Sequence, residues 1–107
     1  MQYYERFEDI SMMIIANSGA ARSKSHEALC IAKKGSFDKA EELLKQAEDS
    51  LYEAHKTHRE LLRLDAKGEV KDVTLLLTHA QDHLMSSELS LELIKEIIYL
   101  LREVRGE

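Results

Sequence analysis

Apolar residues recur every three or four positions along most of this chain, which is the spacing of one face of an α-helix. Gly35 and Gly68 divide the pattern into three long segments, and each follows a helical stretch where a left-handed residue commonly ends a helix. We predict helices over residues 4–34, 37–66 and 73–105. Ser36 and Asp72 stand just before the second and third segments, so they are the predicted N-caps.

The first two predicted helices each have one apolar face. In the first helix this face contains Phe7, Ile10, Ile14, Ala21, Ala28 and Ile31. In the second helix it contains Phe37, Ala40, Leu44, Ala47, Leu51, Ala54, His58 and Leu61. A glycine inside a helix costs about 1 kcal/mol relative to alanine, so we interpret Gly19 as a point of close helix approach. The short connections favour antiparallel neighbours, and the predicted fold is an all-α, antiparallel three-helix bundle.

The third predicted helix differs because it has two apolar faces. One face, the predicted contact with the other helices, contains Val73, Leu76, Leu84, Leu91, Ile94, Ile98 and Leu101. The other contains Leu75, Thr78, Met85, Leu89 and Leu93, with Asp82 in its middle. A helix that is apolar on two sides is buried on two sides, so we expect chains to assemble through this second face. Copies of Asp82 around a symmetry axis would repel, so a shared cation such as Mg²⁺ or shared protons would be required. The alternative is that Asp82 sits at a water-lined edge.

Composition and charge narrow the classes of function. The chain has 107 residues, the size of one small domain, and it contains no proline, which supports an all-α fold. Its formal net charge is −5, unlike nucleic-acid-binding proteins with a basic face. The apolar run over residues 10–16 is too short to span a membrane, and the single cysteine, Cys30, fits a reducing compartment. We therefore expect a cytoplasmic protein with no nucleic-acid partner and no membrane insertion.

Two histidines on the third predicted helix are the strongest candidates for chemistry. His79 and His83 are four residues apart, so both rings lie on one flank of the helix, with Asp82 beside them. This spacing can place two imidazoles on one metal ion, and the three residues would then form a transition-metal site in a helical bundle. The metalloprotease motif HExxH is absent, because Ala80 follows His79.

The segment around these histidines resembles the signature of the lactose/cellobiose (chitobiose) enzyme IIA family of the sugar phosphotransferase system. Other segments resemble the same family in the same order and at matching spacing, so the resemblance covers nearly the whole chain. The segments are residues 14–23 (IIANSGAARS), 32–40 (AKKGSFDKA), 53–55 (EAH) and 79–85 (HAQDHLM). One departure is His58, which stands where the family commonly has glutamine.

The resemblance implies a single enzyme IIA domain over residues 1–107 that acts as a phosphotransferase component. His79 would accept a phosphoryl group from the phosphocarrier protein HPr and pass it to a cysteine of enzyme IIB. The transfer would serve uptake of a β-linked disaccharide through the membrane enzyme IIC. The resemblance also implies a homotrimer with nine helices in one bundle, in which one Asp82 per subunit surrounds a shared Mg²⁺ on the trimer axis.

Histidine suits a phosphoryl carrier, since its unperturbed pKa of about 6.5 leaves a neutral ring nitrogen available for attack at cellular pH. His83, one turn after His79, can donate a hydrogen bond to the phosphoryl group. Gln81 points elsewhere because it is two residues from His79, so we expect it to support the site of a neighbouring subunit. No predicted helix start lies beside His79, so side chains or water would have to meet the added charge.

Overall fold

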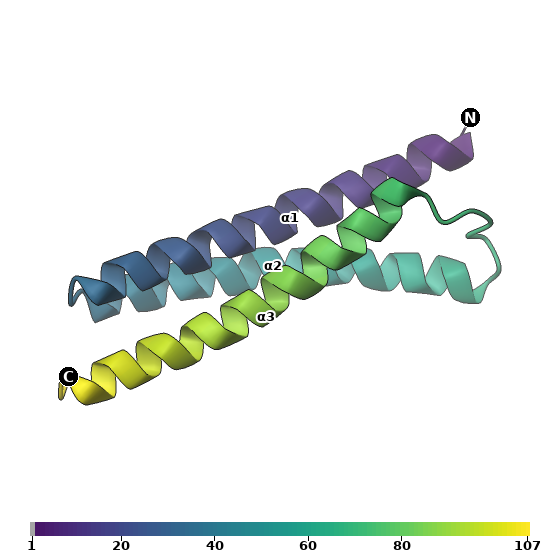
Figure 1. The fold of residues 1–107 in the computed structure, drawn as a ribbon. Coiled ribbons are helices and arrows are strands. Elements are labelled where there is room, and N and C mark those ends of the chain that lie inside the picture. The colour runs from purple at the N-terminus through teal and green to yellow at the C-terminus, as the bar shows by residue number, and fades with distance from the viewer. Residues whose placement is uncertain (1) are drawn as a thin grey trace.

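Three long α-helices make up the computed structural model, which describes the backbone of residues 2–107 and the side chains from residue 5 onward. They are α1 (Gln2–Lys33), α2 (Phe37–Ala66) and α3 (Leu75–Val104). Figure 1 shows α1 and α2 side by side, with α3 crossing them obliquely in an elongated molecule of 56 × 19 × 19 Å. Consecutive helices run antiparallel, so the predicted three-helix fold is confirmed. None of the helices in the described residues is long and apolar enough to cross a membrane.

The turn between α1 and α2 lies where the sequence predicts it. Gly35 has a φ of +91° and Gly68, after α2, has a φ of +76°, and residues with a Cβ atom rarely adopt such values. α2 begins and ends at the predicted residues. Ser36 is the N-cap of α2, but its side chain makes no capping hydrogen bond.

The start of α3 differs from the prediction. The predicted N-cap Asp72 is wrong, because Thr74 caps the helix with a hydroxyl oxygen that accepts a hydrogen bond from the Leu77 amide at 3.1 Å. Thr74 has an extended backbone, and Val73 lies in the connection before the helix. Because α3 begins at Leu75, His79 is only one turn from the helix start.

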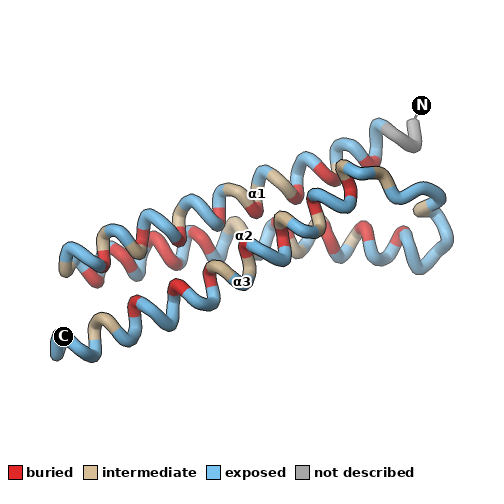
Figure 2. The backbone as a smooth tube through the Cα atoms, in the orientation of Figure 1, coloured by how far each residue is buried: buried red, intermediate tan, exposed pale blue. Residues whose placement is uncertain are grey.

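The core follows repeats of three and four residues on all three helices (Figure 2). On α2 the predicted face is buried, and only Leu51 is partly exposed. Four of the predicted residues of α1 are buried, namely Phe7, Ile14, Ala21 and Ala28, whereas Ile10 and Ile31 lie at the edge of the core. The prediction missed Ser11, Ser18 and Ser25, which are completely buried on the same face.

The core face of α3 also needs correction. Its buried residues are Leu77, Ala80, Leu84, Ser87, Leu91, Ile94 and Ile98. Val73 was wrongly placed in the core, because it precedes the helix and is 69% exposed. Leu76 and Leu101 are half-buried at the edges. The buried positions therefore follow the 3-4 spacing of a coiled coil, which the polar or small residues at 80 and 87 concealed in the sequence.

The stability of the fold should depend strongly on Leu84. This residue is completely buried in the apolar cluster at the end of the bundle where α1 begins. We expect Leu84→Ala to lower the free energy of unfolding by about 2–5 kcal/mol, from lost burial and the cavity left behind. Urea unfolding at fixed protein concentration measures the loss. Leu62→Ala is the control, because Leu62 is half-exposed on α2 and its truncation should cost about 0.5 kcal/mol or less.

Candidate functional site

The face of α3 opposite the core is exposed and largely apolar. The exposed fraction lies between 50% and 86% for Leu75, Met85, Leu89 and Leu93. The same face continues toward the C-terminus through Ile97, Leu100 and Val104. The second apolar face of this helix is therefore confirmed as a surface that a single chain leaves uncovered.

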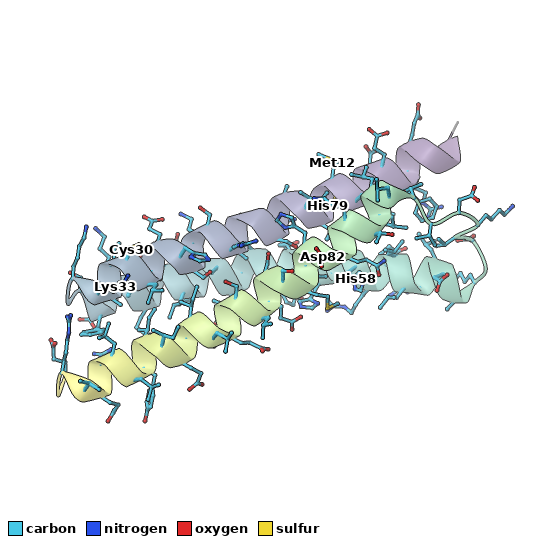
Figure 3. All side chains as sticks on the ribbon, in the orientation of Figure 1. Met12, Cys30, Lys33, His58, His79 and Asp82 are labelled. Carbon is cyan, nitrogen blue, oxygen red and sulfur yellow. The ribbon has the colours of Figure 1, made fainter. Side chains whose placement is uncertain are left out.

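Asp82 lies on this exposed face, in the first half of α3 (Figure 3). In the part of the chain that the structure describes, its carboxylate has no ion-pair partner. Among the same residues, no group of three or more His, Cys, Asp or Glu side chains could hold a metal ion. A metal ion at Asp82 would therefore need ligands from other copies of the chain or from water.

His79 and His83 are brought together as predicted. Their ring centroids are 5.7 Å apart and the rings meet edge to face, with an interplanar angle of 72°. His79 is exposed and lines a shallow apolar hollow with Leu75 and Leu76. Side chains on a helix lean toward its N-terminus, and this hollow shows that the His79 ring faces the first turn of α3.

His83 is the more enclosed of the two histidines. Its ring packs against α1 at Gly19, where an added Cβ atom would lie 3.7 Å from His83 Cε1. That is an ordinary contact distance, so Gly19 faces a ring rather than a tightly apposed helix backbone. The Nδ1 atom of His83 is buried and has no hydrogen-bond partner among the residues that the structure describes. The buried nitrogen of the His83 ring is thus Nδ1.

Gln81 faces α2 instead of the two histidines. Its side-chain carbonyl oxygen lies 3.2 Å from Nε2 of His58, which is only 8% exposed. If the ring donates to this oxygen, the Gln81 amide NH₂ is left to donate elsewhere. The departure at residue 58 is therefore accommodated by a side-chain pair within one subunit. Whether Gln81 also supports a neighbouring subunit stays a prediction.

Further polar pairs join α2 to α3 on this side of the bundle. His55 Nε2 lies 3.3 Å from a Glu88 carboxylate oxygen, and Lys95 Nζ lies 2.7 Å from Glu48. The hydrogen bond that Lys95 donates to the Glu48 carboxylate raises the pKa of Lys95 above its ordinary value. Sequence reasoning missed these pairs, although each places a residue of α2 opposite a complementary residue of α3 at antiparallel spacing.

Comparison of this chain with known protein families indicates the class of function to which it belongs. A protein-family model described as "PTS system, Lactose/Cellobiose specific IIA subunit" matches residues 9–102. The chain is also similar to the PTS system N,N'-diacetylchitobiose-specific EIIA component of Escherichia coli (strain K12). The two are 44% identical over 103 residues, which cover 95% of this chain and 88% of the relative.

Solved structures show the same fold. The crystal structure of the PTS cellobiose-specific enzyme IIA from Bacillus anthracis matches with a TM-score of 0.90 and 40% identity, covering 94% of this chain and 93% of that one. A solution structure of the IIA(chitobiose)–HPr complex of Escherichia coli matches with a TM-score of 0.81 and 43% identity, covering 92% and 96%. Both matches extend over nearly the full length of the two chains compared.

Proposed function

Because this chain belongs to the lactose/cellobiose-specific IIA family of the phosphotransferase system, we propose that His79 accepts a phosphoryl group from HPr and passes it to a cysteine of enzyme IIB. The observation that carries the proposal is the exposed ring of His79 beside the more enclosed ring of His83. A carrier needs one accessible nucleophile that two protein partners can reach in turn. His79 meets this need, and residues 1–107 act as one IIA domain.

The chemistry requires little beyond position and charge stabilisation. A neutral ring nitrogen of His79 forms the N–P bond while the bond between phosphorus and the donor breaks. In the second transfer, the thiolate of enzyme IIB forms an S–P bond and the N–P bond of His79 breaks. His79 then leaves as the same neutral ring, so no other residue has to take or supply a proton.

The position of His79 near the start of α3 also favours the phosphorylated form. Phosphorylation adds about −1.5 to −2 charges at neutral pH. α3 begins at Leu75 and the His79 ring leans over the first turn, so the phosphoryl group lies close to the positive end of the helix dipole. In this proposal the start of α3 adds to the side chains and water that we expect to meet the charge. His83 and the Gln81 amide are the proposed supporting donors.

The assembled form is a homotrimer with nine helices. The uncovered apolar face of α3 supports this proposal, because a face of that size and composition is expected to pack against other copies. Three copies of α3 around one axis would bury Leu89 and Leu93 and bring three Asp82 carboxylates together. The same packing would set His79 of each copy at the edge of the central contact.

A shared Mg²⁺ fits the residues at the centre of this trimer. One Asp82 per chain offers hard oxygen ligands and has no internal ion-pair partner among the described residues. Three carboxylates would hold the ion, and its charge would offset their mutual repulsion. No step of phosphoryl transfer depends on it, so its proposed role is to stabilise the assembly.

Chelation should distinguish the wild type from Asp82→Asn. The wild type is first saturated with Mg²⁺ at 100 times the Kd of the ion. We expect removal of this Mg²⁺ to lower the free energy of unfolding by about 2.7 kcal/mol. The Asp82→Asn variant should unfold at the same urea concentration with and without chelator, because it has no carboxylate to hold the ion. A chelator effect of equal size in both proteins would contradict the assignment.

HPr is the proposed donor because a similar IIA protein has been solved in complex with HPr. Enzyme IIB is the proposed acceptor, and enzyme IIC in the membrane would carry a β-linked disaccharide. The named relatives act in chitobiose and cellobiose systems, which agrees with that substrate class. All these transfers occur in the cytoplasm, where we propose that this chain works.

Incubation with phosphoenolpyruvate, enzyme I and HPr, followed by intact-mass measurement, tests the carrier function. We expect each chain to gain one phosphoryl group that acid removes and that added enzyme IIB discharges. Omitting HPr should prevent the gain. A wild-type chain that gains nothing from phosphorylated HPr would exclude the proposed function.

A further inference from the structure

The five histidines of the chain all lie among the described residues, and they differ in whether the ring is engaged. Three of them have Nε2 beside a polar side-chain atom of α3: His26 at 3.4 Å from Ser90, His55 at 3.3 Å from Glu88, and His58 at 3.2 Å from Gln81. His79 and His83 form no hydrogen bond or ion pair with any other described residue and contact each other instead. Two unengaged imidazoles one helical turn apart are therefore available to a ligand.

The His83 ring has one nitrogen turned inward and the other turned outward. Its Nδ1 atom is buried and unpaired among the described residues, and its Cε1 atom faces Gly19 of α1. The Nε2 atom has no hydrogen-bond partner there either, and it is not one of the buried unpaired atoms, so solvent reaches it. Nδ1 is unpaired in either tautomer of the neutral ring. Placing the ring proton on Nδ1 therefore frees the Nε2 lone pair without leaving a further polar atom unsatisfied.

The two rings have nearly the separation that one shared metal ion requires. A zinc ion lies about 2.0–2.1 Å from each imidazole nitrogen in a tetrahedral site, which sets the ring centroids about 5 Å apart. The centroids of His79 and His83 are 5.7 Å apart, and His79 is exposed, so a small rotation of its side chain brings both nitrogens onto one ion. The four-residue spacing is also that of the two zinc-binding histidines in helical metalloprotease sites.

We propose that His79 and His83 form a two-histidine site for a divalent transition-metal ion such as Zn²⁺, and that this ion and the phosphoryl group exclude each other at His79. Water completes the coordination, because no group of three His, Cys, Asp or Glu side chains among the described residues could hold an ion. Imidazole suits zinc and copper, whereas carboxylates suit Mg²⁺, so this site is distinct from the proposed Asp82 site. The dipole at the start of α3 opposes a cation, but by no more than about fivefold in affinity.

The exclusion follows from the single free lone pair of a neutral imidazole, and it rests on the proposed function. One ring nitrogen carries the proton, so only the other can form a bond to a metal ion or to phosphorus. A zinc ion on His79 occupies the lone pair that would form the N–P bond. A phosphoryl group on His79 occupies it in turn and leaves His83 as a single ligand. Zinc would therefore inhibit acceptance of the phosphoryl group, and phosphorylation would release zinc.

Calorimetric titration with Zn²⁺ tests the site in the unphosphorylated protein, without a histidine tag and with excess Mg²⁺ present to fill carboxylate sites. We expect the wild type to bind one Zn²⁺ per chain. Loss of an outer partner of a metal ligand weakens binding by about 10–100-fold, so His79→Ala and His83→Ala should each weaken it by at least that factor. His26→Ala is the matched control, because it removes an exposed histidine of α1 and should bind Zn²⁺ as the wild type does.

NMR of the ¹⁵N-histidine-labelled protein locates the ion. Zn²⁺ should shift the ring-nitrogen resonances of His79 and His83 and leave those of His26 unchanged. Asp82→Asn should show the same shifts, because its carboxylate is not a ligand of this site. Unweakened binding by His79→Ala, or one Zn²⁺ per three chains that Asp82→Asn abolishes, would overturn the two-histidine site. His79 is exposed, so its variant decides the question even if His83→Ala disturbs the packing against α1.

Transfer from phosphorylated HPr tests the exclusion separately. HPr is phosphorylated first and freed of enzyme I, so that Zn²⁺ cannot act on enzyme I. At a Zn²⁺ concentration of about ten times the Kd, we expect the rate of acceptance to fall about tenfold, and a chelator should restore it. His83→Ala should lose far less of its own zinc-free rate. Equal inhibition of the two proteins would overturn the exclusion. If the wild type is never phosphorylated, the proposed function fails, and the titration still decides the metal site.

Discussion

His79→Ala is expected to abolish phosphoryl acceptance from HPr. The substitution removes the ring whose nitrogen forms the N–P bond in the proposed mechanism, and loss of a catalytic nucleophile in other enzymes lowers rates by on the order of a millionfold. The fold should be unaffected, because His79 is exposed, its ring meets the His83 ring, and it lines a shallow hollow with Leu75 and Leu76. Transfer of labelled phosphate from HPr through this chain to enzyme IIB measures the loss.

His83→Ala is the matched control, since it removes the neighbouring ring from the same helix. We expect this variant to remain a carrier whose transfer is slower by about a hundredfold, the effect of losing one hydrogen-bond donor to a charged transition state. If the His83→Ala variant accepted no phosphoryl group while the His79→Ala variant still accepted one, the roles of the two histidines would be exchanged. The proposal for His79 would then be wrong.

Leu89→Lys is expected to convert the assembled protein into monomers. Leu89 is 57% exposed in the single chain and lies two turns after Asp82 on the uncovered face of α3. Burying a leucine stabilises an interface by about 1.5–3 kcal/mol, and each copy of the trimer would lose that contribution. Each copy would also bring an unpaired ammonium group into an apolar contact, which costs further free energy. Sedimentation velocity should show the mass falling from three chains of 12.3 kDa to one.

Leu62→Lys is the control for this experiment. Leu62 is also a leucine, it is 50% exposed, and it belongs to α2 instead of α3. We expect this variant to sediment as the wild type does. Monomers of wild-type protein at micromolar concentration, or a trimeric Leu89→Lys variant, would contradict the proposed use of the α3 face.

Most of the fold could be predicted because the pattern of apolar residues and the positions of the glycines divide the chain into the same three helices. The face of α2 shows this well, since large residues such as Phe37 and Leu44 mark it along its full length. On α1 and α3 the core is partly made of serine and alanine, which carry little hydrophobic signal. Ser18 and Ser87 were therefore missed, although their seven-residue spacing from other core positions would have shown them.

The sequence was enough to predict that His79 and His83 lie together, but not which side chains surround them. The four-residue spacing placed His79 beside His83, because that relation is fixed within one helix. The pair between His58 and Gln81 was not predictable, since it depends on how α2 and α3 align. The start of α3 was also misplaced, because Asp72 and Thr74 are both good caps in sequence and only the path of the connection decides between them.

Location of the phosphoryl group in the wild-type protein is the most direct test of the central claim. After transfer from HPr, the chain would be fragmented by electron transfer, which preserves the labile N–P bond, and the fragments weighed. The account predicts a single phosphoryl group on His79 in every modified chain. A phosphoryl group on His83, or on any of the other histidines, would contradict it.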